Sequence, residues 1–233
     1  MPLSRTINKG LKRHVPALHR VLRWAFIQGV SLLLLPHIAS QWKAKRSLMR
    51  QHHLPVLLRH LRLHGEGVEI GVLTGYFSEN ILSWSRLSCL HSVDPWREFG
   101  SDYHDIANTA QAEHDRKYEE TRRRLAKYGK RSHIMRMTSE EASKHFQNHA
   151  LDFVFIDANH SYEAVRDDIR FWWPKLKSGG IFAGHDYLDG EIPEGTFGVK
   201  KAVDEFVQSH RLTLFVVEEK WPTWYLQKPL SAQ

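Results

Sequence analysis

The stretch LDFVFIDANHSYEAVRDDI, residues 151–169, contains the change of pattern on which the fold prediction rests. It begins as an apolar run typical of a buried strand, breaks off at Asp157, Asn159 and His160, and continues with helical spacing. A strand that passes directly into a helix is the repeating unit of an open α/β sheet. Ligands of such sheets bind outside the carboxyl ends of the strands, so residues 157–160 are candidate site residues.

The same alternation of β-type and helix-type runs extends on both sides of this stretch. The expected strands cover residues 67–72, 90–94, 132–137, 151–157 and 180–186, and the expected helices between them cover residues 76–87, 140–146 and 161–176. This order predicts an α/β fold in which five parallel strands carry helices on both faces. Two later β-type runs, residues 211–219 and 223–228, predict a C-terminal antiparallel hairpin that completes a seven-stranded sheet.

Cysteine content and hydropathy exclude several classes of protein. The single Cys89 excludes an intramolecular disulfide framework and a four-cysteine zinc site, and it favours a reducing, cytoplasmic location. The apolar segment of residues 24–35 contains Gln28 and Gly29 and is shorter than the ~20 residues of a membrane span. No small-residue cleavage site follows it, so neither a cleavable signal nor a spanning helix is expected.

The charge of the chain is unevenly distributed, because no Asp or Glu precedes Glu66. Residues 1–65 hold 12 of the 33 Lys and Arg, or +12, and the remainder combines 21 basic with 26 acidic side chains, or −5. We therefore expect a basic helical N-terminal extension, residues 1–62, followed by the sheet domain, residues 63–233. Such a block predicts peripheral contact of residues 1–60 with an anionic membrane surface. The alternative is a solvated extension without a dedicated partner.

The ends of the first two expected strands carry residues suited to a nucleotide-like ligand. Gly71 and Gly75 flank a tight turn in EIGVLTGYFSEN, residues 69–80, where backbone can approach a ligand closely. This turn lacks the G-x-G-x-x-G pattern of dinucleotide sites, which disfavours a dehydrogenase. Asp94 ends the second strand, in position to accept the hydroxyls of a ribose. The alternative for Asp94 is a turn or helix-cap role before Pro95.

Together these segments resemble the class I S-adenosylmethionine-dependent methyltransferases. GVEIGVLTGYFSENIL, residues 67–82, is similar to the first motif of that family, and Asp94 occupies the place of its ribose-binding acid. FIDANHSYEAVRDDIRFWWPKLKSGGIFAGHDY, residues 155–187, is similar to the macrocin-type sugar O-methyltransferases and cephalosporin-hydroxylase-like proteins. The resemblance covers residues 66–228, and it implies a Rossmann-like fold, S-adenosylmethionine as cofactor and a hydroxyl group as methyl acceptor.

The resemblance also implies roles for individual cofactor-binding residues. Glu69 and Gly71 would lie by the methionine part of the cofactor, with Ser78 nearby, and Ser139 would meet the adenine ring. Phe77 departs from the pattern, because catechol-type relatives have a small hydroxyl residue at that place. The group that holds the cofactor carboxylate therefore stays open between Ser78 and backbone N–H groups.

Acidic residues end the fourth and fifth expected strands, Asp157 and Asp186, with His185 beside the second. Neighbouring parallel strands lie ~4.8 Å apart, so both carboxylates can converge on one cation. Carboxylate oxygens suit Mg²⁺, whereas an imidazole from His185 favours Mn²⁺, Fe²⁺ or Zn²⁺, or only orients Asp186. The alternative for Asp157 is a helix cap.

His160 follows Asp157 at the place where the catechol-type relatives have a lysine. An imidazole titrates near neutral pH, which suits it to remove the proton of an acceptor hydroxyl. His160 and Asp157 are therefore the predicted catalytic residues, and the alternative for His160 is a solvated turn position.

The predicted activity is methylation of a hydroxyl group, on a sugar or glycan first and on a small phenolic or natural product second. Two connections, residues 95–120 and 187–198, are long enough to serve as lids or substrate walls. Their candidate stacking residues are Trp96, Tyr103, His104 and Tyr187. The alternatives are a nucleic-acid methyltransferase, disfavoured because no N/D-P-P-Y/F signature occurs, and a non-catalytic binding protein on the same fold.

Overall fold

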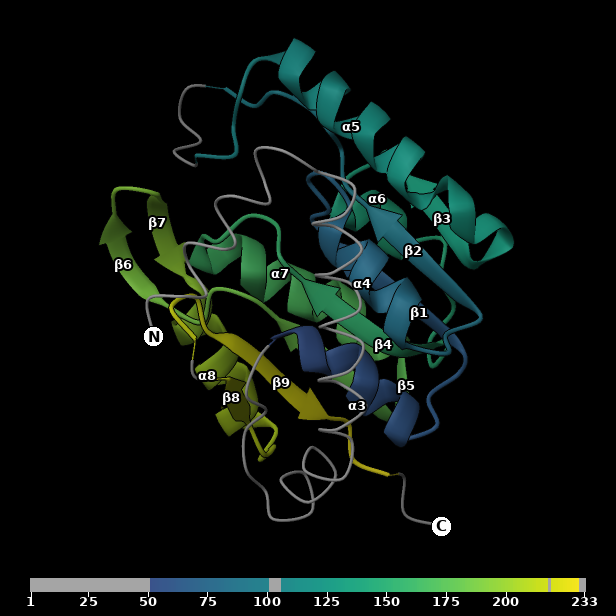
Figure 1. Cartoon of the computed structure of the whole chain (residues 1–233). Helices are drawn as coiled ribbons and strands as arrows, with labels where there is room; N and C mark the ends of the chain where they lie inside the picture. Colours follow the sequence, from purple (N-terminus) through teal and green to yellow (C-terminus); the bar gives the residue numbers. More distant parts are fainter. Residues whose placement is uncertain (1–50, 101–105, 218, 231–233) are drawn as a thin grey trace, which may run out of the picture.

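The computed structural model describes residues 51–100, 106–217 and 219–230 (Figure 1). Most of the predicted basic extension, including the apolar segment of residues 24–35, lies outside these ranges, as do Tyr103 and His104. Within the described ranges, the helices are all too short or too polar to cross a bilayer.

Seven strands form one sheet in the order β3-β2-β1-β4-β5-β9-β8 (Figure 1). The strands are β1 (Glu66–Ile70), β2 (Cys89–Val93), β3 (Ser132–Met135), β4 (Leu151–Ile156), β5 (Leu176–Gly184), β8 (Phe215–Val217) and β9 (Thr223–Gln227). The strands β1 to β5 pair in parallel, and β9 pairs antiparallel with both β5 and β8. This arrangement confirms the predicted fold class. Chain order reverses between β1 and β4, and such a switch point opens a crevice at the carboxyl ends of the strands.

Helices cover both faces of the sheet (Figure 1). One face packs against α3 (Leu54–His60) and α4 (Tyr76–Trp84), and the other against α6 (Ser139–Ser143), α7 (Tyr162–Trp172) and α8 (Val199–Ser209). The central β4 is buried throughout, with Phe153 and Phe155 on the first face and Val154 and Ile156 on the second. Burial on both faces explains why this strand is a continuous apolar run rather than an alternating one.

Helix α3 lies within the segment predicted as the N-terminal extension, yet it contributes to the core. Its Leu54, Leu57 and Leu58 have no exposed surface and join the cluster formed by α4 and the sheet. Short 3₁₀ turns η1 (Gln51–His53), η2 (Ala126–Arg131) and η3 (Trp173–Lys175) adjoin α3, α5 (Gln111–Leu125) and α7.

The two long connections contain secondary structure that the sequence pattern does not predict. Helix α5 (Gln111–Leu125) forms after β2, and a separate ribbon of β6 (Asp189–Ile192) and β7 (Gly195–Gly198) follows β5. The buried side chains of α5 are His114, Lys117, Thr121 and Leu125. Three of these four are polar, so a search for apolar residues at helical spacing passes over the helix.

Candidate active site

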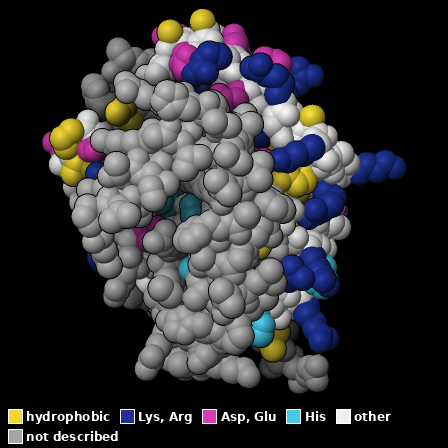
Figure 2. Space-filling model, in the orientation of Figure 1, with side chains coloured by type: hydrophobic (Ala, Val, Ile, Leu, Met, Phe, Trp, Pro, Cys, Tyr) yellow, Lys and Arg dark blue, Asp and Glu magenta, His cyan; other side chains and the backbone are white. Residues whose placement is uncertain are grey.

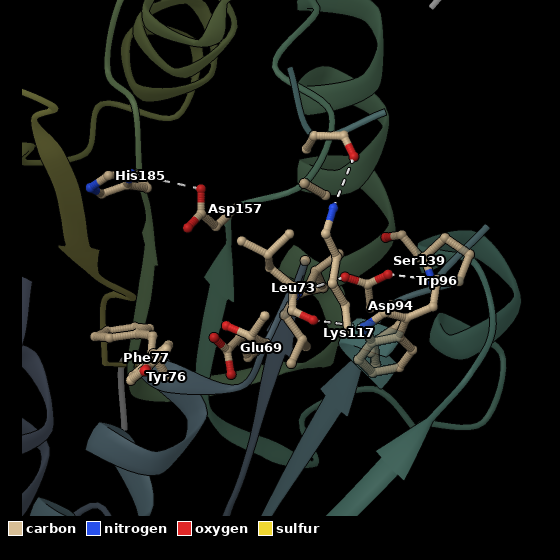
Figure 3. Close-up of a pocket in the computed structure, with 18 of the residues that line it drawn as sticks. Glu69, Leu73, Tyr76, Phe77, Asp94, Trp96, Lys117, Ser139, Asp157 and His185 are labelled. Atoms are coloured by element: carbon tan, nitrogen blue, oxygen red, sulfur yellow. Dashed lines mark hydrogen bonds and ion pairs between the residues drawn. The ribbon is translucent and has the colours of Figure 1, made fainter. Parts of the chain in front are cut away.

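A cleft of about 1970 Å³ opens at the carboxyl ends of β1, β2 and β4 (Figure 3). Its lining includes seven predicted site residues: Glu69, Gly71, Asp94, Ser139, Asp157, His160 and His185. The other three, Gly75, Ser78 and Asp186, contact lining residues from behind. In Figure 3, His185 points toward Asp157 on one side, and Asp94, Trp96 and Ser139 stand together on the other.

Gly71 follows β1 with a φ of +82°, a left-handed conformation that strains residues with a side chain. A Cβ at this position would lie 2.0 Å from the carbonyl oxygen of Asp157. The missing side chain therefore allows the end of β4 to meet the end of β1, where Asp157 N donates to the Ile70 carbonyl at 2.7 Å. Gly75, with a φ of +74°, is the N-cap of α4. The neighbour that requires glycine at position 71 is thus the protein's own β4.

Glu69 faces the cleft from β1 and is almost fully buried. The hydroxyl of Ser78, from α4, donates to its Oε2, and the hydroxyl of Ser92 donates to Ser78 Oγ at 3.1 Å. Burial raises the pKa of Glu69 well above its usual value, and the hydrogen bond from Ser78 opposes that shift. A cationic group bound beside this carboxyl would favour its ionised form.

Asp94 closes β2 and binds the turn between β1 and α4. Its Oδ2 accepts from Val72 N at 2.9 Å and from Leu73 N at 3.0 Å, and its Oδ1 accepts from Trp96 N at 2.7 Å. A carboxylate offers about four acceptor positions, so three backbone amides leave about one for a ligand hydroxyl. Asp94 thus lies where the sequence predicts a ribose-binding acid, and it also stabilises the glycine turn.

Residues that sequence reasoning missed hold the same turn from the opposite side. The Leu73 carbonyl accepts from Trp96 Nε1 at 2.8 Å and from Thr121 Oγ1 at 3.3 Å, while Arg124 Nε donates to the Thr74 carbonyl at 2.8 Å. The sequence predicts Trp96 as a stacking surface, whereas its side chain is 1% exposed and its N–H is used by the turn. The sequence signal that could have identified Thr121 and Arg124 is the helical spacing of polar residues in α5.

Ser139 begins α6 and connects it to α7. Its hydroxyl accepts from Trp172 Nε1 at 2.8 Å and donates to Oδ1 of Asp168. Asp168 is 6% exposed, and burial raises its pKa to about 7, with the hydrogen bond from Ser139 opposing the shift. Sequence reasoning missed Asp168, because most helical acids lie on the solvated face.

The raised pKa of Asp168 predicts a pH-dependent stability. The folded protein keeps a proton on Asp168 up to about pH 7, whereas the unfolded chain releases it near pH 3.8. The free energy of unfolding should therefore fall as pH rises between these values. Relative to wild type, Asp168→Asn should gain on the order of 4 kcal/mol between pH 4 and pH 8 in urea unfolding. The control Glu163→Gln, at an exposed acid of the same helix, should keep the wild-type fall with pH. Parallel curves for all three proteins would contradict the assignment.

Asp157, His160 and Asp186 form a compact group at the ends of β4 and β5. One ligand atom from each lies within 4.8 Å of the others. His160 Nε2 is 3.1 Å from Asp186 Oδ2 and 3.8 Å from Asp157 Oδ1. His185 Nδ1 is 2.9 Å from Asp186 Oδ1 and 3.7 Å from Asp157 Oδ1. The two carboxylates thus converge as predicted, and both histidines contact both of them.

The charges of this group favour an ionised Asp186. Burial would raise its pKa, but the adjoining imidazoles of His160 and His185 outweigh burial and hold the pKa well below the usual range. Burial would lower the pKa of His185, and its contact with Asp186, together with the charges of Asp157 and Asp186, raises it instead. Two carboxylates beside two imidazoles provide mixed oxygen and nitrogen donors, which suit a divalent cation such as Mn²⁺ as well as a proton-transfer group.

The β6–β7 ribbon positions His160. The ring of Phe197, in β7, stacks on the His160 ring with centroids 4.8 Å apart, and Gly198 N donates to the His160 carbonyl at 2.8 Å. Trp221 extends the stack beyond Phe197, at 6.1 Å. The predicted substrate wall of residues 187–198 therefore supports the imidazole directly.

A family model described as "Methyltransferase domain" matches residues 68–187, just over half of the chain. No curated protein matches the sequence.

The fold is similar to a candidate caffeoyl-CoA O-methyltransferase from Staphylococcus aureus, at 14% identity and a TM-score of 0.57, over 90% of this chain and 99% of that one. An O-methyltransferase from Bacillus cereus in complex with SAH has 14% identity and a TM-score of 0.54, over 88% and 97%. An rRNA methylase from Streptococcus thermophilus has 14% identity and a TM-score of 0.51, over 76% and 93%. At these identities the similarity to solved structures establishes the fold alone.

Proposed function

Because the chain belongs to the methyltransferase domain family, we propose that it transfers a methyl group from S-adenosylmethionine to a hydroxyl. The Bacillus cereus neighbour contains SAH, the form of this cofactor that remains after methyl transfer, and it supports that choice of donor. The observation that carries the proposal is the convergence of Asp157, His160 and Asp186 beside a cleft at the carboxyl ends of β1 and β4.

The chemistry of the cleft fits this cofactor. Glu69 is a buried carboxyl suited to a cationic amino group, Asp94 retains an acceptor position for a ribose hydroxyl, and Ser139 lies beyond it for the adenine. The hydroxyl of Ser78 is fully buried and donates to Glu69. We therefore assign binding of the cofactor carboxylate to the backbone N–H groups at the start of α4, which follow Gly75.

The acidic pair also fits a divalent cation, which we assign to Asp157 and Asp186, with His185 bound to Asp186. When bound, Mg²⁺ or Mn²⁺ would lower the pKa of the acceptor hydroxyl and orient it. His160 then removes the hydroxyl proton, and the stacked Phe197 ring keeps its imidazole directed at the acidic pair.

We propose a sugar or glycan hydroxyl as acceptor, with a small phenolic hydroxyl second, from the resemblance of residues 155–187 to the macrocin-type enzymes. The decisive experiment has two steps. Titration calorimetry with S-adenosylmethionine, with and without Mn²⁺, tests cofactor and metal. A mass-spectrometric screen of glycans and phenols then identifies products heavier by one methylene. Absence of cofactor binding in the folded protein would refute the proposed function.

Asp94→Ala should weaken S-adenosylmethionine binding at least about tenfold, since hydrogen bonds to a charged group contribute ~1.5–3 kcal/mol. Part of the loss will come from the turn, because Asp94 accepts three backbone amides there. Calorimetry measures the affinity, and circular dichroism checks the fold. Unchanged affinity in a folded variant removes Asp94 from the cofactor site.

The described surface gives no support to nucleic acid as the substrate. Figure 2 shows Lys and Arg side chains along one edge of the molecule, with Asp and Glu among them at the top. On α5, Arg116, Arg122 and Arg124 each form an ion pair with a glutamate of the same helix. Neutralised cations of this kind contribute little to phosphate binding. A catalytically silent binding protein would leave the acidic pair and His160 without a role.

We propose that residues 1–60 attach the protein peripherally to an anionic membrane, on the strength of their acid-free, basic composition. The full chain should pellet with phosphatidylserine vesicles at low salt and be released at high salt, because exposed charge contacts are screened. Neutral vesicles are the control. Equal pelleting with both would point to the apolar segment of residues 24–35 instead, and no pelleting would refute membrane attachment.

A further inference from the structure

One face of α7 lines the far end of the cleft, beyond Asp94. Ala164, Asp168 and Phe171 recur at helical spacing along this wall, next to Ser139 at the start of α6. Asp168 is the buried acid of the set, at 6% exposure, and it takes no part in the chemistry assigned above. A buried carboxyl in a cleft wall is costly unless it is hydrogen-bonded.

The hydrogen bonds of Ser139 determine which oxygen of Asp168 is available. Trp172 Nε1 can only donate, so Ser139 Oγ accepts from it and directs its own proton to Asp168 Oδ1. In the described part of the chain, no hydrogen bond is formed to the second oxygen, Oδ2. The side chain is thereby held in one orientation, and in the ionised carboxyl Oδ2 is the acceptor left for a ligand.

The order of polar side chains along the cleft indicates which part of the ligand would lie beside Asp168. The acidic pair and Glu69 lie at the ends of β4 and β1, Asp94 at the end of β2, and Ser139 after β3. If the proposed function holds, the sulfonium end of the cofactor lies beside Glu69 and the acidic pair, and its ribose lies at Asp94. The purine then occupies the end between α6 and α7.

We propose that Oδ2 of Asp168 accepts a hydrogen bond from the exocyclic amine of the cofactor's purine, which makes Asp168 a specificity-determining residue for the base. The amine carries the hydrogen-bond donors of adenine, and Asp168 lines this end of the cleft with Oδ2 as the oxygen that Ser139 does not occupy. Because burial places the pKa of Asp168 at about 7, a donor can draw the carboxyl into its ionised, accepting form near neutral pH. This inference rests on the proposed function, because it presumes an adenosyl ligand.

The first test uses the wild-type chain and two ligands. S-adenosylhomocysteine is compared by calorimetry with its analogue in which hydrogen replaces the 6-amino group of the purine. Loss of a hydrogen bond to a charged acceptor should weaken binding about 10- to 100-fold. Equal affinities would overturn the inference. Failure of S-adenosylhomocysteine itself to bind would instead refute the proposed function.

Two variants then assign the discrimination to Asp168. In the isosteric Asp168→Asn, Ser139 still donates to the carbonyl oxygen, so the amide NH₂ faces the ligand amine and the preference for the amine should disappear. Asp168→Ala removes the acceptor altogether and should bind both ligands equally. Glu163→Gln is the matched control, since Glu163 is an exposed acid of the same helix outside the cleft lining. Its preference should equal that of wild type. Discrimination retained by a folded Asp168 variant would overturn the assignment.

Discussion

His160→Ala lowers kcat by about 10²–10⁴-fold while cofactor binding stays normal, if His160 is the general base. The physical reason is that its Nε2 lies 3.1 Å from Asp186 and 3.8 Å from Asp157, next to the site proposed for the acceptor hydroxyl. The residual rate should rise with pH, as an already ionised acceptor makes the base unnecessary. Steady-state kinetics across pH measures both effects.

The same position also allows His160 to be a metal ligand, and a second measurement separates the two roles. If His160 is only the base, His160→Ala should bind Mn²⁺ with unchanged affinity. If His160 is a metal ligand, the substitution should weaken Mn²⁺ binding. Asp157→Ala and Asp186→Ala should lose activity that added Mg²⁺ or Mn²⁺ recovers only partly. His145→Ala, at an exposed histidine, is the control.

Chelation decides between the metal and the histidine. Wild-type activity that survives exhaustive metal removal, with His160→Ala still inactive, would eliminate the metal and leave the histidine as the catalytic group. Turnover of His160→Ala at the wild-type rate would eliminate the proposed base.

Gly71→Ala destabilises the protein by at least about 3 kcal/mol, the upper range for a strained backbone conformation with a steric clash added. The added Cβ would lie 2.0 Å from the Asp157 carbonyl oxygen, at a φ of +82°. The ends of β1 and β4 would have to separate, which also displaces Asp157. Urea unfolding measures the loss, and calorimetry measures the accompanying loss of cofactor and metal binding.

Gly129→Ala is the matched control for this substitution. Gly129 also has a positive φ, of +54°, but a Cβ there meets nothing within 4 Å. With a ψ of −128° it should cost only the conformational strain, about 1–3 kcal/mol. Equal losses for the two variants would show that the contact between Gly71 and β4 contributes no stability.

The sheet was predictable because its signals are local. An apolar run such as residues 151–156 followed by helical spacing identifies a strand and a helix without knowledge of their neighbours. Polar residues at strand ends could be found for the same reason, since parallel strands bring Asp157 and Asp186 to one edge of the sheet. Helix α5 escaped detection because its buried side is mostly polar.

The contacts that organise the site could not be predicted, because each joins residues distant in the chain. Trp96 and Thr121 bind the Leu73 carbonyl, and Asp168 receives the hydroxyl of Ser139, over separations of 23, 48 and 29 residues. No period of hydrophobic residues encodes such pairs.

The sequence by itself determined the class of fold, the strand ends that carry acids, and the methyltransferase family that the glycine turn and Asp94 resemble. Tertiary structure alone decided which histidines contact the acidic pair, that Gly71 is required by β4, and that Asp168 is a buried acid in the cleft wall. The reason is physical. Periodicity along a chain reports which face of an element is buried, whereas hydrogen-bond partners and pKa shifts depend on what packs against that face.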